Sequence, residues 1–388
     1  MLFRSVAVSY CCTRVAINAF LTLSFLQTLP VEAASLRQLL HQQILTVDAE
    51  SFEPLALAVF RYQAAYNPIY RQYLHYLNVQ PMQLTDLSRV PFMPIGFFKN
   101  HTILTGLDSS QKAVEESLTF ASSGTTGTDT SRHLVPDPDL YDAVSTRIFE
   151  QTYGPLRGFH ILALLPSYLE RNNSSLVYMV QRFMDQTGSA RTGHSGTNFF
   201  LDNLDELTGR LRHLTAHPDG KRVLLIGVTF ALLNWAESGH DLHFLADNPD
   251  LIVMETGGMK GRRKELLREE VHELLTGRLG VSAIHSEYGM TELLSQAYSA
   301  GEGVFRPGST LRVFLRDIND PFQPIAPRQT GERRTGGINV VDLANLDSCS
   351  FIETQDLGQH VGEDGNFRVI GRFDNSDVRG CNLLVISG

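Results

Sequence analysis

Short apolar runs alternate with helix-length segments through the middle of this sequence, and this rhythm constrains the fold more than any other feature. Strands are predicted at 118–121, 159–165, 223–227, 251–255 and 281–285, and helices at 139–153 and 260–275. The apolar runs have the length of buried strands, and their alternation with helices is typical of a mostly parallel sheet. We therefore expect an α/β fold with its core over residues 101–300.

The regions on either side of this core have different patterns. Residues 35–100 are expected to be helical, because apolar and aromatic residues recur there at helical spacings until Pro91 and Pro94 interrupt the pattern. We expect the aromatic side chains to form core packing rather than a binding surface. Residues 301–388 contain short apolar runs separated by turn signals, which predicts a small β-rich subdomain.

Residues 1–34 allow two interpretations. Arg4 and Arg14 lie before or at the start of an apolar run that ends in Val-Glu-Ala-Ala, as in a secretory signal. The alternative, which we favour, is an extension upstream of the folded domain or a product of start-site choice. Polar residues interrupt the apolar run, so we expect no stable membrane span.

Composition excludes several classes of protein. Of the 388 residues 43% are hydrophobic and 19% charged, a balance that excludes an intrinsically disordered chain. The 42 acidic residues against 33 Lys and Arg give a net charge of −9, which argues against a nucleic-acid partner. The 4 cysteines are too few for a disulfide framework, and the sequence has no Cys-x-x-Cys pair of the kind that forms zinc ribbons.

A loop rich in glycine and hydroxyl residues follows the predicted strand at 118–121. It consists of Ser122, Ser123, Gly124, Thr125, Thr126 and Gly127. The glycines allow a tight turn whose backbone N–H groups can bind an anion, and the hydroxyls can donate to phosphate oxygens. Taken alone, the loop is equally consistent with a solvent-exposed turn, and it lacks the lysine of a Walker loop.

Three further segments carry candidate ligand-binding groups. Tyr288, Thr291 and Glu292 follow the predicted strand at 281–285, and ligands bind at strand ends in α/β sheets. A hydroxyl beside a carboxylate can hold a phosphate and its Mg²⁺. Asp356 follows a predicted strand at 350–353 and could accept both hydroxyls of a ribose, or simply cap a turn. Arg372 could pair with phosphate or ribose oxygens.

Taken in order, these segments resemble the motifs of the adenylate-forming superfamily, which includes acyl-CoA synthetases, peptide-synthetase adenylation domains and firefly luciferase. The order is Ser-Ser-Gly-Thr-Thr-Gly, Gly-Gly, Tyr-Gly-x-Thr-Glu, Thr-x-Asp and Gly-Arg-x-Asp. Blocks at 167–171, 254–262, 285–292 and 374–381 are similar to the acyl-protein synthetase branch, the long-chain-fatty-acid luciferin-component ligases. The resemblance covers about residues 50–388. It implies a large adenylating domain with mostly parallel sheets and a small β-rich closing subdomain.

The resemblance implies roles for the residues that match the nucleotide-binding motifs. The loop Ser122–Gly127 would hold the β- and γ-phosphates of ATP. Gly257 and Gly258 would line the adenine pocket, and Tyr288 would stack on the base.

Four other matching residues would contact the rest of the nucleotide and its metal. Thr291 would contact the α-phosphate, and Glu292 would bind Mg²⁺. Asp356 would bind the ribose hydroxyls, with Arg372 nearby. The expected cofactors are therefore ATP and Mg²⁺.

Two departures from the superfamily pattern change the expected chemistry. The phosphate loop lacks the usual Pro-Lys continuation, so Arg132 could supply the charge. The hinge motif at Asp374 is normally followed by a mobile C-terminal domain with a catalytic lysine, and this sequence ends at Gly388. Because the acid's carboxylate and the α-phosphate repel each other, we expect Arg132, Lys260 or Arg262 to neutralise them.

Cys381 matches the position at which the acyl-protein synthetase branch carries its acyl group. A thiolate attacks an acyl-adenylate well, and the resulting thioester keeps the acyl group activated. The alternative is a buried structural cysteine. Cys349 is expected to belong to the core, because it adjoins a predicted apolar strand.

These expectations combine into one hypothesis with two alternatives. The hypothesis is a cytoplasmic AMP-forming ligase, an acyl-protein synthetase. It would activate a carboxylic acid, foremost a fatty acid, transfer the acyl group to its own cysteine and pass it to a partner protein. One alternative is an adenylating acyltransferase whose acceptor is a carrier protein or a glycan. The other is a catalytically weak nucleotide-binding subunit of a complex.

Overall fold

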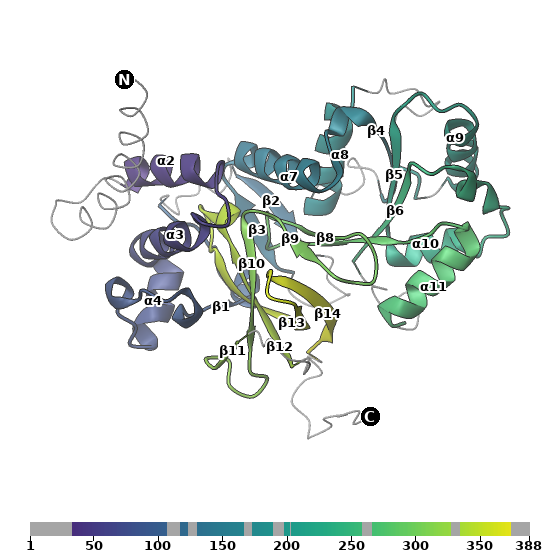
Figure 1. Ribbon diagram of the computed structural model, residues 1–388. Coiled ribbons are helices and arrows are strands. Elements are labelled where there is room, and N and C mark those ends of the chain that lie inside the picture. The colour runs from purple at the N-terminus through teal and green to yellow at the C-terminus, as the bar shows by residue number, and fades with distance from the viewer. Residues whose placement is uncertain are drawn as a thin grey trace, which may run out of the picture.

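The computed structural model describes residues 33–106, 117–122, 130–166, 173–188, 198–201, 203–257, 266–326 and 334–373. Over these ranges the chain is a mixed α/β protein with two six-stranded sheets and one two-stranded sheet (Figure 1). The α/β class predicted from the sequence is confirmed.

The first six-stranded sheet contains the predicted parallel strands. Strands β4 to β7 are parallel neighbours, and β8 and β9 continue the sheet antiparallel. The strands are β4 (Phe159–Leu164), β5 (Arg222–Val228), β6 (Leu251–Thr256), β7 (His285–Tyr288), β8 (Ala297–Ser299) and β9 (Arg306–Pro307). Nearly all residues of β5 and β6 are buried, which explains why their sequences are continuous apolar runs.

Helices connect these strands and cover the sheet. They are α7 (Pro138–Tyr153), α8 (Ser175–Gln186), α9 (Leu204–Ala216), α10 (Thr229–Ala236) and α11 (Arg268–Leu279). Helix α8 packs against β4, and α10 packs against β5 and β6. The buried Trp235 of α10 donates from its indole N–H to Thr208 Oγ1 of α9 at 3.0 Å, so its polar atom is satisfied inside the core.

The second six-stranded sheet is mostly antiparallel. Its order is β1-β13-β12-β10-β11, and β14 also pairs with β13. The strands are β1 (Met93–Pro94), β10 (Leu311–Arg316), β11 (Pro324–Ile325), β12 (Thr335–Asp342), β13 (Phe351–Val361) and β14 (Asn366–Arg372). The β-rich region expected after residue 300 therefore forms a sheet with one strand from residues 35–100, because β1 pairs parallel with β13.

The N-terminal helices pack beside this second sheet (Figure 1). They are α2 (Ala33–Ile44), α3 (Phe52–Tyr66), α4 (Pro68–Tyr76) and α5 (Phe97–Asn100). The rings of Phe60 and Tyr70 lie 5.6 and 6.2 Å from the ring of Phe351 in β13. The expectation that these aromatic residues pack in the core is confirmed for Phe60 and Tyr70, whereas Tyr76 is exposed.

A two-stranded hairpin carries the Gly/Ser/Thr loop between its strands. The strands β2 (Leu118–Ala121) and β3 (Arg132–Val135) pair antiparallel. Short 3₁₀ helices complete the described connections: η1 (Pro81–Gln83), η2 (Leu87–Arg89), η3 (Leu156–Gly158), η4 (His243–Asp247) and η5 (Leu343–Asn345).

Two predicted boundaries around α11 were wrong. The helix expected over 260–275 spans Arg268–Leu279, where the Leu267 N–H donates to the Glu270 carboxylate at 2.7 Å and so satisfies a donor at its start. Gly280, in a left-handed conformation at φ 70°, ends the helix. The residues after Gly280 form a connection. The strand expected at 281–285 therefore begins later and spans His285–Tyr288.

The strand expected at 350–353 was also placed too short. Strand β13 runs from Phe351 to Val361 because its pairing with β14 extends it. Asp356 therefore lies within a strand rather than after one. Likewise, Tyr288 is the last residue of β7 rather than part of the following loop.

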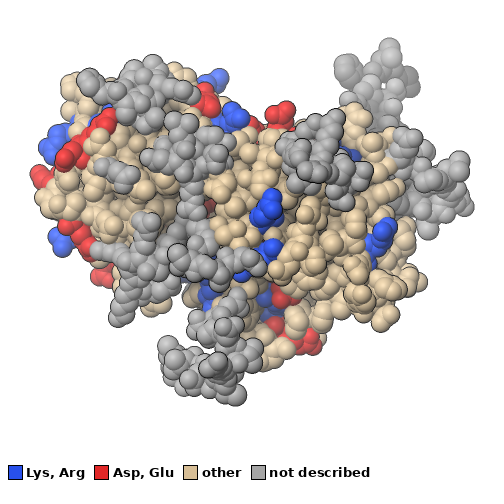
Figure 2. All heavy atoms as spheres, turned by 180° about the vertical axis from the view of Figure 1, so that it is seen from behind, with Lys and Arg blue, Asp and Glu red and all other residues tan. Residues whose placement is uncertain are grey.

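Charged side chains of both signs are scattered over the face of the molecule drawn in Figure 2, with some Lys and Arg near its middle. Within the described ranges, no helix combines the length and hydropathy that crossing a membrane requires.

Candidate functional site

The predicted site residues that the structure describes gather where β7, β13, β14 and the β2–β3 hairpin meet. Tyr288 ends β7, Asp356 lies in β13, and Arg372 ends β14. Because β6 and β7 are parallel, their carboxyl ends share one edge of the sheet, which is where α/β proteins bind ligands. The fold thus brings together residues that are far apart in the sequence.

Tyr288, Asp356 and Arg372 form a polar chain at this edge. The Tyr288 hydroxyl donates to Asp356 Oδ2 at 2.9 Å, and Arg372 Nε lies 3.1 Å from Asp356 Oδ1. The Tyr288 ring is buried and packs on Phe367 and Phe305, with ring centroids 5.3 and 5.9 Å apart. Stacking of this ring on adenine stays a prediction, since its contacts in the structure are with protein.

Burial dominates the electrostatics of this chain. It raises the pKa of Asp356, although the charge of Arg372 and the hydrogen bond from Tyr288 act in the opposite direction. Burial and the Asp356 charge also raise the pKa of Tyr288, so the phenol stays a donor. Each carboxylate oxygen has a second lone pair, so Asp356 retains capacity to accept from a ligand hydroxyl.

Glu292 is a buried carboxylate beside the β2–β3 hairpin. It is 5% exposed, and desolvation raises its pKa, against a side-chain hydrogen bond from Ser131 and the charge of Arg372. Ser131 itself pairs with Ser122, whose Oγ accepts from the Ser131 N–H at 3.0 Å. Ser122, Ser131 and Glu292 therefore lie together at the base of the loop.

The backbone of Thr291 and Glu292 is held from behind by two buried side chains. His133 Nδ1 of β3 lies 2.9 Å from the Thr291 carbonyl oxygen, and Asn345 Nδ2 of η5 donates to the Glu292 carbonyl oxygen at 2.8 Å. Arg132, the predicted cation, is exposed at the first position of β3. Sequence reasoning missed the roles of His133 and Asn345. A signal existed for His133, a polar residue facing inward in an apolar strand.

Gly257 directly follows β6 and adopts φ 71°, a conformation that favours glycine. Its carbonyl oxygen accepts from Thr229 Oγ1 at 2.8 Å. Several other predicted site residues lie outside the described residues. They are Ser123, Gly124, Thr125, Thr126, Gly127, Gly258, Lys260 and Cys381. Arg262 and Asp374 lie outside them as well.

The carboxylate of Glu292 fits a role as the single protein ligand of a phosphate-bound Mg²⁺. Among the described residues no ion pair to this buried carboxylate is found, so a bound cation would favour its ionised form. Mg²⁺ in nucleotide sites takes one or two carboxylates and fills its other positions with phosphate oxygens and water. Within the described part of the chain, no three His, Cys, Asp or Glu side chains cluster as a protein-only metal site.

The sequence matches no family model, and a search of curated proteins finds no match.

Proposed function

We propose that this protein is an AMP-forming ligase of the cytoplasm that activates a carboxylic acid, foremost a fatty acid, with ATP. The observation that supports the proposal best is the meeting of four sequence segments at one sheet edge. Tyr288 contacts Asp356, Asp356 pairs with Arg372, and the Ser131 side chain, at the base of the phosphate loop, lies close enough to Glu292 to lower the pKa of its carboxyl.

In the proposed first step, a carboxylate oxygen of the acid attacks the α-phosphorus of ATP. The bond from that phosphorus to the bridging oxygen breaks, and pyrophosphate leaves with the electron pair. Asp356 would accept from the ribose hydroxyls, and Thr291 would donate to the α-phosphate. Mg²⁺, held by Glu292, would neutralise phosphate charge. Arg132 and Lys260 are the proposed cations that reduce repulsion between the two anions.

In the proposed second step, the thiolate of Cys381 attacks the acyl carbonyl carbon. The carbon–oxygen bond to the phosphate breaks, AMP leaves, and a thioester forms. The thiol proton passes to solvent. The acyl group then moves to an acceptor protein, because a thioester retains the activation that transfer requires.

The proposal is tested by exchange of labelled pyrophosphate into ATP with a panel of acids of increasing chain length. We expect exchange that requires both Mg²⁺ and an acid. No exchange with any acid would refute the ligase.

The role of Cys381 needs a separate measurement. Incubation with ATP and a labelled active acid should give a protein-bound label that hydroxylamine removes, and Cys381→Ser should abolish the label while exchange continues. Label that persists in Cys381→Ser would refute this step. Cys349→Ser is the control and should still be labelled. Cys349 is fully buried and its Sγ donates to the Phe351 carbonyl oxygen, so we do not expect it to carry the acyl group.

A further inference from the structure

Three buried polar atoms near the loop that follows β7 have no hydrogen-bond partner among the described residues, and two of them belong to the side chains that contact the Thr291 and Glu292 carbonyl oxygens. They are His133 Nε2, Asn345 Oδ1 and Ser348 Oγ. The exposed fractions of the three residues are 0%, 0% and 2%. A buried polar atom without a partner loses its hydrogen bonds to water and gains none in the protein, which destabilises the fold by about 1–3 kcal/mol for each atom. Three of them in one place indicate a shared partner.

The free atom of His133 is an acceptor. Its Nδ1 lies 2.9 Å from the Thr291 carbonyl oxygen, which can only accept, so Nδ1 carries the hydrogen. Burial lowers the pKa of His133 to about 4, so the ring is neutral at physiological pH and Nε2 has a bare lone pair. Phe98 packs edge-on against the ring with centroids 5.4 Å apart and keeps it in place.

Asn345 offers a second acceptor and Ser348 a hydroxyl. Asn345 Nδ2 donates to the Glu292 carbonyl oxygen, which assigns the remaining atom as Oδ1. The backbone carbonyl oxygen of Ser348 accepts from Asn67 Nδ2 at 2.9 Å and from Thr105 Oγ1. These bonds fix the Ser348 backbone and leave its hydroxyl able to donate.

All three residues line one small cavity between β3, the start of α7 and the segment after β12. The cavity has about 10 Å³ of space for the centre of a water-sized sphere. That volume is near the minimum needed to hold one water.

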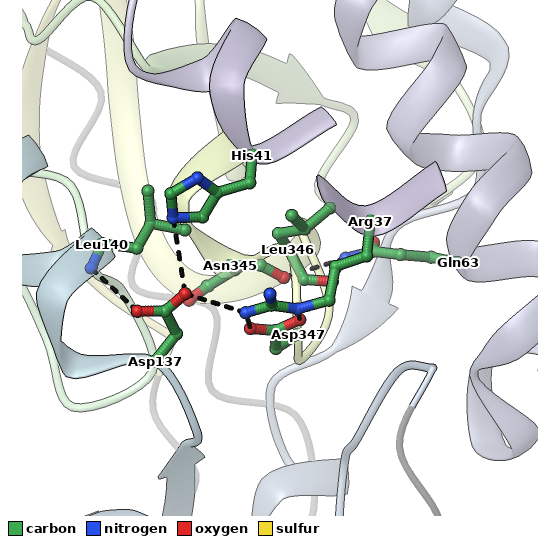
Figure 3. A network of polar contacts seen from close by, with 8 residues as sticks. All are labelled: Arg37, His41, Gln63, Asp137, Leu140, Asn345, Leu346 and Asp347. Atoms are coloured by element: carbon green, nitrogen blue, oxygen red, sulfur yellow. Dashed lines mark hydrogen bonds and ion pairs between the residues drawn. The ribbon is translucent and has the colours of Figure 1, made fainter. Parts of the chain in front are cut away.

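Two carboxylates also line the cavity, and each already pairs with Arg37. Asp347 accepts from Arg37 Nε and Nη2 at 2.6 and 2.5 Å (Figure 3). Asp137 accepts from Arg37 Nη2 and from the Leu140 N–H, and His41 Nε2 lies 3.4 Å from it. Among the lining side chains, the buried atoms without any partner in the described part of the chain are two neutral acceptors and one hydroxyl.

We propose that His133, Asn345 and Ser348 bind a single internal water that supports the Thr291–Glu292 backbone. The water donates one hydrogen to His133 Nε2 and the other to Asn345 Oδ1, and it accepts from the Ser348 hydroxyl. His133 and Asn345 are then positioning residues, since each joins the water to one carbonyl of the loop. The water site stands independently of the reaction, whereas its effect on turnover rests on the proposed function.

A high-resolution crystal structure of the full chain tests the water site. We expect one density peak at about 2.7–3.1 Å from each of the three atoms. The peak should persist in Ser309→Ala, which removes another buried unpartnered hydroxyl away from the cavity. It should vanish in Ser348→Val. An empty cavity, or a peak with the short contacts and many ligands of a metal cation, would overturn the proposal.

The tautomer of His133 gives a test that needs no variant. Long-range ¹H–¹⁵N correlation on histidine-labelled protein should show the ring protonated at Nδ1, with Nε2 accepting a hydrogen bond. A ring protonated at Nε2 would refute the site, even if Ser348→Val failed to fold.

The positioning role is measured by pyrophosphate exchange in folded Ser348→Val. We expect kcat to fall ~10-fold with the KM for ATP nearly unchanged, because small misplacement of reacting groups slows chemistry more than it weakens binding. If kcat is unchanged although the water is displaced, the positioning role is refuted, but the water site itself is not. If the wild-type protein shows no pyrophosphate exchange, the proposed ligase activity is refuted. The electron density and the His133 tautomer would still decide whether the water site exists.

Discussion

At the scale of single residues, two buried carboxylates at the ends of β6 and β7 differ in how their charge is compensated. Burial opposes ionisation of Glu255, but the nearby polar groups of His272, Ser286 and Thr229 and the charge of Arg268 outweigh it and lower its pKa. Thr229 Oγ1 donates to Glu255 Oε2 at 2.8 Å, and Arg268 Nε lies 3.3 Å from Oε1. Glu287 accepts from Thr256 Oγ1 and lies near the negative charge of Glu255. The pKa values of two carboxyl groups on neighbouring strands are therefore shifted in opposite directions.

Burial raises the pKa of Glu287 from 4.5 to about 7, and Glu255 adds to the shift. Between these pH values the folded chain holds a proton that the unfolded chain has released, so the contribution of Glu287 to the free energy of unfolding falls as pH rises. We expect Glu287→Gln to be more stable than wild type by an amount that grows from pH 4.5 to 7. Above pH 7 it should level at roughly 3 kcal/mol.

Urea unfolding of both proteins across this pH range measures the difference. Gln can still accept from Thr256, so the substitution removes the charge and keeps the hydrogen bond. A difference that is constant with pH would contradict the account of Glu287.

At the scale of elements, the turn after β12 ties the site loop to the second sheet. Asp342 accepts from the N–H groups of Leu294 and Ser295 through Oδ2, at 2.7 and 3.0 Å. Its Oδ1 accepts from the Ser295 hydroxyl and the Ala344 N–H, at 2.6 and 3.0 Å. One fully buried carboxylate therefore connects the segment after Glu292 to η5.

Asp342→Asn is expected to destabilise the fold by roughly 2–4 kcal/mol. Either orientation of the amide turns an NH₂ group toward at least one backbone N–H, so one or two hydrogen bonds are lost and those that remain no longer have a charged acceptor. Urea unfolding with an unchanged m-value would measure this loss. Asp320→Asn, at an exposed turn, is the control and should change stability by less than about 0.5 kcal/mol. Equal effects of the two substitutions would contradict this role of Asp342.

The sequence predicted the positions of the strands better than their ends and the contacts between them. Apolar runs located β4, β5 and β6, because a buried parallel strand needs a continuous apolar sequence. The end of β13 was missed, because its last residues alternate in burial and are held by pairing with β14. The motifs at 288–292, 356 and 372 identified side chains that do meet. The contact between Tyr288 and Asp356 depends on how two different sheets lie together, which no local pattern encodes.

At the scale of the whole molecule, the N-terminal helices and the β-rich region share a core and a buried polar network. Arg37 of α2 pairs with both Asp347, after η5, and Asp137, at the start of α7 (Figure 3). Gln63 of α3 donates to the carbonyl oxygens of Asn345 and Leu346 at 2.8 and 3.1 Å. These contacts join segments from opposite ends of the sequence, so local sequence patterns could not predict them.

Arg37→Met should destabilise the molecule by roughly 3 kcal/mol, because it leaves the buried Asp347 carboxylate without its cation. Arg182→Met is a matched control, since Arg182 pairs with Asp142 at 3.3 Å on the surface and such pairs contribute at most about 1 kcal/mol. Thermal and urea unfolding of both variants measure the contrast. A smaller loss for Arg37→Met than for Arg182→Met would refute this role of the network.

The central claim is that the chemistry at this sheet edge forms an acyl-adenylate. The most direct measurement is mass spectrometry of the products formed by the full chain with ATP, Mg²⁺ and each acid of the panel. Our account predicts acyl-AMP and pyrophosphate, with both greatly reduced in Glu292→Gln. ADP and phosphate, or no adenylate with any acid, would contradict it.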